Sequence, residues 1–148
     1  MVVALVVPFA GLKNVAVIGG GNAAIDAART ALRLGAESVK ILYRRTRAQM
    51  PAWGEEVNAA DLEGIDILTL VAPEEILRDA DGNVTGVRCR EMVLGDYDRS
   101  GRRRPVAGRN PDFVVEADTV IAAIGQKLDA PAILDGTPVE LNRWGYLA

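Results

Sequence analysis

The 148-residue chain contains no histidine and only one cysteine, Cys89. Without histidine, the chain cannot use His-based proton transfer, a Ser–His or Cys–His nucleophile pair, or a His-ligated zinc ion. A lone cysteine allows neither an internal disulfide nor a cysteine-based metal cluster. We therefore expect no metal site and no catalytic side chain, and we expect Cys89 to be inert packing because no evident base activates it. Any catalysis in which the chain takes part would then depend on a bound cofactor.

The chain also lacks an excess of positive charge, since 17 Lys and Arg residues stand against 20 Asp and Glu residues. We therefore expect no binding of nucleic acid through bulk charge, and any basic site has to be local. The apolar run at residues 1–7 is too short to cross a bilayer and lacks the basic leader of a signal peptide. The apolar fraction of 49% and the charged fraction of 25% predict one globular domain. We expect no membrane span and a cytoplasmic location.

Short apolar runs without alternation indicate strands that are buried on both faces of a parallel sheet. Such runs occupy residues 15–18, 38–43, 65–71 and 119–124, and helical patterns occupy residues 22–34 and 52–63. Antiparallel strands are predicted at residues 75–78, 84–94 and 113–116, with a turn at 79–83 and a loop at 95–110. This order predicts an α/β fold, a Rossmann-like three-layer domain with a parallel sheet and an inserted antiparallel β-meander.

Three glycines lie where the first predicted strand becomes the first helix. Gly19, Gly21 and Ala24 fit the pattern G-x-G-x-x-A. In that pattern the first position allows a tight turn, the second lets a diphosphate approach the backbone, and the third lets the helix pack closely on the sheet. The phosphates would meet free N–H groups and the positive end of the helix dipole. A plain strand-to-helix turn without a ligand is the alternative, and the place directly after a buried strand favours dinucleotide binding.

The second predicted strand ends in basic residues. Many NAD-binding domains carry an Asp or Glu there, about 20 residues after the glycines, which binds the ribose 2′-hydroxyl. This chain has Arg44 and Arg45 instead, with Arg47 close by. Guanidinium groups match a 2′-phosphate in geometry and charge, so the pattern favours NADP(H) over NAD(H). A solvated basic loop is the alternative.

Several segments together resemble one protein family. They are residues 17–31 with the glycine loop, Tyr43-Arg44-Arg45, Met50-Pro51-Ala52, and residues 55–57, 86–89, 100–106 and 117–126. From about Lys13 to Gln126 the chain is similar to the NADPH-binding domain of the glutamate synthase small (beta) subunit and its relatives. Members of that family hold FAD in one dinucleotide-binding domain and NADPH in another that is inserted into it. Hydride passes from nicotinamide to flavin, and electrons continue through iron–sulfur clusters to a partner subunit.

The motifs and the resemblance together predict a cofactor site. Its residues are Gly19, Gly20, Gly21, Asn22, Ala23, Ala24, Asp26, Arg44, Arg45, Ala123, Ile124 and Gly125. The resemblance implies that the glycine loop lines the diphosphate, that the two arginines hold the 2′-phosphate, and that residues 123–125 meet the flavin side and the nicotinamide. Asp26 matches a family acid that points toward the nicotinamide end, and a solvated carboxylate is the alternative.

The family pattern is incomplete in this sequence, which has no second G-x-G-x-x-G for FAD and no cysteine set for iron–sulfur clusters. We expect residues 13–126 to form the NAD(P)H-binding domain, residues 1–12 to be a lead-in segment, and residues 127–148 to be a C-terminal tail toward a missing flavin-binding half. A fragment of a longer protein is favoured over a chain that needs a separate partner. The expected partners are NADPH, a flavin-binding domain, and an iron–sulfur protein or glutamate synthase large subunit.

Other interpretations compete with this hypothesis. A non-catalytic NAD(P)-sensing module would bind the same ligand, but residues 123–126 resemble a flavin-facing joint. A short-chain dehydrogenase would need a Tyr-x-x-x-Lys pair, which the sequence lacks. Residues 102–104 are three arginines that we expect in a solvated hairpin loop, with a docking surface as the alternative. No aromatic residues interleave with them, which disfavours nucleic acid.

Overall fold

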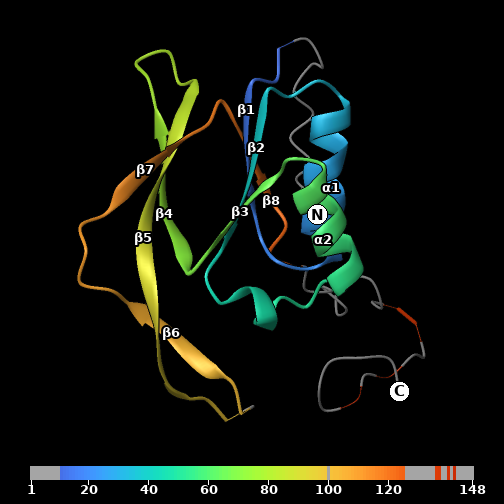
Figure 1. Ribbon diagram of the computed structural model, residues 1–148, viewed down its shortest axis with the longest axis vertical. Coiled ribbons are helices and arrows are strands. Elements are labelled where there is room, and N and C mark those ends of the chain that lie inside the picture. Colours follow the sequence, from blue (N-terminus) through green and yellow to red (C-terminus); the bar gives the residue numbers. More distant parts are fainter. Residues whose placement is uncertain (1–10, 100, 126–135, 138–139, 141, 143–148) are drawn as a thin grey trace.

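The computed structural model describes residues 11–99, 101–125, 136, 137, 140 and 142. Nearly all of the expected lead-in segment and of the expected C-terminal tail lies outside the described residues. In the part that is described, two helices, a parallel sheet and an antiparallel sheet form three layers (Figure 1). No helix within that part is long and apolar enough to span a membrane.

The middle layer is a parallel sheet with the strand order β3-β2-β1-β8. Its strands are β1 (Asn14–Ile18), β2 (Ser38–Tyr43), β3 (Asp66–Thr69) and β8 (Thr119–Ala122). Val15, Ala16 and Val17 are all buried, because one face of β1 meets the helices and the other meets the second sheet. β2 and β8 lie on opposite sides of β1, so a crevice opens at the carboxyl ends of these strands.

Both helices cover the same face of the parallel sheet (Figure 1). They are α1 (Asn22–Arg33) and α2 (Gly54–Leu62), and a short 3-10 turn, η1 (Arg47–Gln49), precedes α2. α1 buries Ala24, Ile25, Ala28 and Ala31, and its small residues let it lie close to the sheet. It ends at Arg33, and Gly35 forms the predicted left-handed cap, where φ is +99° and the Ala36 N–H donates to the Ala31 carbonyl at 3.1 Å.

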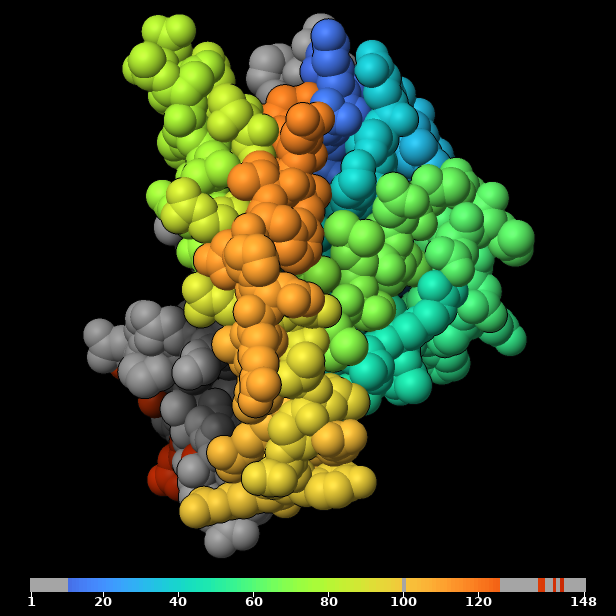
Figure 2. Space-filling model, turned by 60° about the vertical axis from the view of Figure 1, so that its left-hand side comes forward, coloured from blue at the N-terminus to red at the C-terminus, as the bar shows by residue number. Residues whose placement is uncertain are grey.

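The third layer is antiparallel and is built around one long strand. Its strands are β4 (Val71–Arg78), β5 (Val84–Tyr97), β6 (Arg103–Ala107) and β7 (Phe113–Glu116). β5 pairs with each of the other three, and Figure 2 shows β7 (orange) lying along β5 (yellow). Val87, Cys89 and Val115 form a core with Ala16 and Leu42 of the parallel sheet. Burial raises the pKa of the Cys89 thiol to about 11, in agreement with the predicted inert packing.

Two predicted elements were wrong in their extent. The strand predicted at residues 65–71 is divided at Leu70, which has a φ of 57° and separates β3 from β4. The loop predicted at residues 95–110 is instead largely a hairpin, because β5 continues to Tyr97 and Arg103–Ala107 pairs with it as β6. The segment was predicted as a loop because it is rich in polar and basic residues, whereas its strand β6 is held by pairing with the C-terminal part of β5.

Candidate functional site

A pocket of about 810 Å³ lies at the carboxyl ends of β1, β2 and β8. This volume is typical of a small-molecule site, and the end of the strands is where open α/β sheets bind ligands. Its walls come from the glycine loop, the end of β2, the start of β4, the β5–β6 connection and the segment after β8. The lining residues are Ile18, Gly19, Gly20, Gly21, Asn22, Ala23, Leu42, Tyr43, Arg44, Arg45, Pro51, Ala72, Pro73, Arg102, Ala123, Ile124 and Gly125.

The three glycines of the loop meet different surroundings. Gly19 has a φ of +148°, and a Cβ there would overlap the Ala123 carbonyl oxygen. A Cβ at Gly20 would overlap the ring of Tyr43, whereas a Cβ at Gly21 would have only Pro51 Cγ nearby, at 3.9 Å. The space beside Gly21 is therefore open on the pocket side. The first amides of a helix point out of its N-terminal end, and the start of α1 borders the pocket. No side chain caps this end of α1.

The loop before α2 is fixed to the glycine loop. The Ala52 N–H donates to the Gly20 carbonyl at 3.1 Å, and the Trp53 N–H donates to Asn22 Oδ1 at 3.0 Å. These bonds place Pro51 in the pocket wall. The Met50-Pro51-Ala52 motif therefore builds the site, although the sequence did not predict Pro51 as a lining residue.

The two predicted arginines differ in what they contact. Arg44 is exposed, and within the described residues no hydrogen bond or ion pair engages its side chain. Arg45 also borders the pocket, but its Nη1 donates to the Arg103 carbonyl at 2.8 Å and its Nη2 lies 3.4 Å from Asp98 Oδ2. Of these two arginines, Arg44 is therefore the one whose guanidinium group has no partner in the part of the chain that the structure describes.

A third arginine, Arg102, reaches the same pocket from the β5–β6 connection. The sequence indicated a solvated loop for it, because a basic run has no local feature that reveals which strand the hairpin will face. Tyr43 lines the same pocket, and its hydroxyl donates to the Gln49 carbonyl at 2.7 Å. Burial raises the pKa of Tyr43, and the charges of Arg45, Arg102 and Arg44 oppose that rise. Positive charge is therefore gathered at this end of the pocket.

The segment after β8 forms the other end of the pocket. The Ala123 N–H donates to the Ile18 carbonyl at 2.8 Å, and Gly125 has a φ of +93°. Ile124 is 76% exposed, unusually high for a large apolar side chain beside a pocket. Ala24, another predicted site residue, does not border the pocket and is fully buried beneath the glycine loop.

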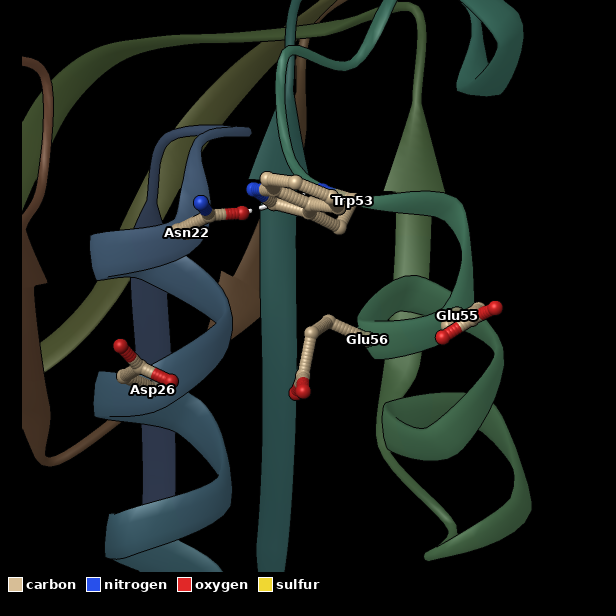
Figure 3. Close-up of a pocket in the computed structure, with 5 residues that line it drawn as sticks. All are labelled: Asn22, Asp26, Trp53, Glu55 and Glu56. Atoms are coloured by element: carbon tan, nitrogen blue, oxygen red, sulfur yellow. Dashed lines mark hydrogen bonds between the residues drawn. The ribbon is translucent and has the colours of Figure 1, made fainter.

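Asp26 lies beside a second, smaller pocket of about 310 Å³ between the N-terminal ends of α1 and α2 (Figure 3). This pocket is lined by Asn22, Asp26, Trp53, Glu55 and Glu56, of which only Asn22 also borders the larger one. Glu55 points away from α1 (Figure 3). In the described ranges, no group of three His, Cys, Asp or Glu side chains could hold a metal ion. The structure thus places Asp26 next to the predicted site but outside its main cavity.

Residues 4–148 match the family described as "Pyridine nucleotide-disulphide oxidoreductase". The chain belongs to this family. The match covers nearly the whole sequence, including the glycine loop, the arginines after β2 and the segment after β8.

Named relatives of this pyridine nucleotide-disulphide oxidoreductase chain are components of larger assemblies. The chain is 50% identical over 132 residues to the NADPH-Fe(3+) oxidoreductase subunit beta of Geobacter sulfurreducens, which covers 89% of this chain and 20% of the relative. It is 43% identical over 136 residues to the glutamate synthase [NADPH] small chain of Azospirillum brasilense, covering 91% of this chain and 28% of the relative. The chain therefore spans less than a third of these curated relatives.

Solved structures support the fold. FprA of Mycobacterium tuberculosis in complex with NADPH has a TM-score of 0.69 at 19% identity, covering 92% of this chain and 42% of that one. Thioredoxin reductase of T. acidophilum has a TM-score of 0.67 at 22% identity, covering 91% and 38%. The predicted Rossmann-like fold and the predicted relationship to glutamate synthase small subunits are confirmed. NADPH and FAD, the predicted cofactors, are those that the family and the glutamate synthase small chain imply.

Proposed function

We propose that this chain is the NADPH-binding domain of a flavoprotein oxidoreductase and presents the nicotinamide for hydride transfer to FAD in a flavin-binding domain. The observation that carries the proposal is that the glycine loop and Arg44, which lie far apart in the sequence, border one pocket. Two relatives that are named for NADPH support the same nucleotide. Residues 13–126 would form the nucleotide-binding unit.

The residues around the pocket fit a dinucleotide. The backbone of Gly20 and Gly21 and the start of α1 would hold the diphosphate, because a side chain at Gly21 would project into the open space that the phosphates need. Arg44 would pair with the 2′-phosphate, since its guanidinium group carries forked donors and a permanent charge. The segment from Ala123 to Gly125, across β1 from the arginines, would support the nicotinamide end.

The role of the chain in the reaction would be to position the nucleotide. Bound NADPH supplies the hydride, which is chemistry that belongs to the cofactor. The glycine loop and Arg44 would fix the adenosine half at two points, so that the other half is held in a defined orientation. Hydride transfer requires no side-chain acid or base, which suits a chain without histidine.

The proposed partners follow from the larger size of the relatives. A flavin-binding domain would accept the hydride, and an iron–sulfur protein or a glutamate synthase large subunit would be the electron partner. The proposed location is the cytoplasm. Expression of the whole open reading frame around this chain tests the flavin. We expect a flavin absorption band that NADPH bleaches, whereas a nucleotide-sensing module would show no such band.

Calorimetric titration of the purified chain with NADPH and NADH tests the nucleotide assignment. We expect NADPH to bind at least about tenfold more tightly, because a hydrogen bond to a charged group contributes about 1.5–3 kcal/mol. Arg44→Ala should weaken NADPH binding by about tenfold and leave NADH binding unchanged. Arg109→Ala removes an exposed arginine that does not border the pocket and serves as the control. Equal binding of both nucleotides by the unmutated chain would contradict the assignment.

A further inference from the structure

The β5–β6 hairpin brings an arginine to the phosphate-binding end of the pocket. Arg102 directly precedes β6, is exposed, and borders the pocket together with Arg44 at the end of β2. These two residues come from different layers of the fold. Their common position at the pocket therefore depends on how the hairpin is held against the parallel sheet.

Asp98 fixes the backbone at Arg102. The Asp98 N–H donates to the Arg102 carbonyl at 2.7 Å, and the Gly101 N–H donates to the Asp98 carbonyl at 3.0 Å. In addition, Asp98 Oδ1 accepts a hydrogen bond from the Arg102 N–H at 3.1 Å. Both backbone polar groups of Arg102 are therefore bonded to one residue, which defines where its side chain leaves the hairpin.

Arg45 connects this hairpin to the end of β2. Its Nη2 lies 3.4 Å from Asp98 Oδ2, and its Nη1 donates to the Arg103 carbonyl at 2.8 Å. The side chains of Arg45 and Asp98 are only 12% and 18% exposed. A guanidinium group that is bound to a carboxylate and a carbonyl in a half-buried place has few donors left for a ligand. Arg45 therefore stabilises the position of the hairpin.

The charge of a phosphate monoester favours more than one cationic partner. Such a group carries a charge of about −1.5 to −2 at neutral pH and has three acceptor oxygens. Arg44 alone would neutralise about one half to two thirds of it. Arg44 and Arg102 both border the pocket beside Tyr43. Burial raises the pKa of Tyr43, and the charges of Arg102 and Arg44 both oppose that rise, so both charges act on the same end of the pocket.

We infer that Arg102 binds the ribose 2′-phosphate together with Arg44, and that Asp98 and Arg45 are positioning residues that hold the hairpin carrying Arg102. This inference rests on the proposed function, since it requires a 2′-phosphorylated nucleotide in the pocket. It also reassigns Arg45, which the sequence predicted as a phosphate ligand, to a role in the fold.

Titration with NADP⁺ and NAD⁺ tests this inference, because the two ligands differ only in the 2′-phosphate. We expect Arg102→Ala to weaken NADP⁺ binding about tenfold and to leave NAD⁺ binding unchanged. Arg104→Ala removes the same charge from the same hairpin at a position that does not border the pocket, and it should bind both ligands like the unmutated chain.

Two negative results have different meanings. If the unmutated chain prefers NADP⁺ and Arg102→Ala keeps that preference in full, the inference is overturned while the proposed function stands. If the unmutated chain binds NADP⁺ no better than NAD⁺, the proposed function itself fails. Thermal unfolding of each variant checks that a loss of binding does not come from a loss of folding.

The positioning role of Asp98 is tested by the ratio of the two dissociation constants, which a general loss of stability would not change. Asp98→Ala should reduce the preference for NADP⁺, and the double variant with Arg102→Ala should be no worse than Arg102→Ala alone, since Asp98 acts through Arg102. Asp98→Asn keeps an oxygen acceptor for the Arg102 N–H and should restore most of the preference. Additive losses in the double variant would overturn this role.

Discussion

Adjacent glycines in the phosphate-binding loop are required for different physical reasons. Gly19 has a positive φ and lies against the backbone oxygen of Ala123, so neither its conformation nor its neighbour can adapt to a side chain. Gly20 has no positive φ, and its constraint is the ring of Tyr43, which is fixed by the hydrogen bond from its hydroxyl to Gln49. The obstacle at Gly20 is thus a side chain that a second mutation can remove.

This difference predicts which glycine substitution can be rescued. Gly20→Ala should weaken NADPH binding by at least about tenfold, because the Tyr43 ring and the loop have to move apart. The double variant Gly20→Ala/Tyr43→Ala should bind more tightly than Gly20→Ala, whereas Gly19→Ala should gain nothing from Tyr43→Ala. Calorimetry on the four variants and on Tyr43→Ala alone makes the comparison. Equal rescue of both glycine substitutions would show that the Tyr43 contact is not the constraint.

At the scale of elements, Leu70 is the point at which the chain changes from the parallel to the antiparallel sheet. Its φ of 57° lies in the left-handed region, which costs a non-glycine residue about 1–2 kcal/mol. The Leu70 N–H donates to the Arg45 carbonyl at 3.0 Å, and its carbonyl accepts from the Met92 N–H at 2.7 Å. These two bonds hold the strained residue between β2 and β5.

Substitutions at Leu70 should therefore follow backbone preference more than side-chain size. Leu70→Gly should be less destabilising than Leu70→Val by about 1 kcal/mol, although valine keeps more apolar surface. Leu68 in β3 is the matched control, where the order should reverse because glycine weakens a strand. Urea unfolding provides the free energies. A valine at position 70 that is tolerated better than glycine would contradict the strained conformation.

The two helices are joined by a cluster of charged side chains. Arg29 of α1 forms ion pairs with Glu56 and with Glu63, and Arg33 forms one with Glu63 at 2.8 Å. The hydrogen bond from Arg29 holds the pKa of Glu63 below its ordinary value of 4.5. A lowered folded-state pKa means that the contribution of Glu63 to stability is present above pH 4.5 and is lost as the pH falls through the folded value.

Removal of Arg29 should change the acid dependence of stability. We expect the free energy of unfolding of the unmutated chain to fall between about pH 5 and pH 3, and to fall less steeply in Arg29→Met. Arg109→Met, which removes an exposed charge elsewhere, should follow the unmutated chain. Urea unfolding at several pH values gives both slopes. An Arg29→Met curve parallel to that of the unmutated chain would refute the coupling.

Local sequence features predicted the elements whose causes are local. The apolar run of β1, the glycines that follow it and Gly35 after α1 each act on their own neighbours, and these elements lie where the sequence placed them. The β6 strand and the role of Arg102 depend on contacts between distant parts of the chain. Arg45 and Asp98 are separated by 53 positions, and nothing in either local sequence indicates that they pair.

The sequence predicted the same role for Arg44 and Arg45 because it does not show that Arg45 pairs with Asp98. Composition and spacing describe what a guanidinium group can bind, whereas its choice between a ligand and a carboxylate depends on the folded surroundings. The same limit applies to Asp26, whose place on α1 follows from helical geometry but whose neighbouring pocket is formed only when α2 packs beside it.

At the scale of the whole molecule, the pocket is a product of all three layers. The parallel sheet supplies the ends of β1, β2 and β8, the helical layer supplies the start of α1 and Pro51, and the antiparallel layer supplies Ala72, Pro73 and Arg102. Because no single layer encloses the pocket, a ligand that fills it should affect residues from all three layers together.

Amide chemical shifts of the isotope-labelled chain, recorded as NADP⁺ is added, most directly test whether the nucleotide binds in this pocket. We predict the largest changes at Gly20, Gly21 and Asn22, where the diphosphate would meet the backbone, with concerted changes at Arg44, Arg102 and Gly125. NAD⁺, which lacks the 2′-phosphate, should affect the glycine loop but neither Arg44 nor Arg102. Changes confined to the smaller pocket around Asp26, or to the outer face of the antiparallel sheet, would contradict nucleotide binding at the β1–α1 loop.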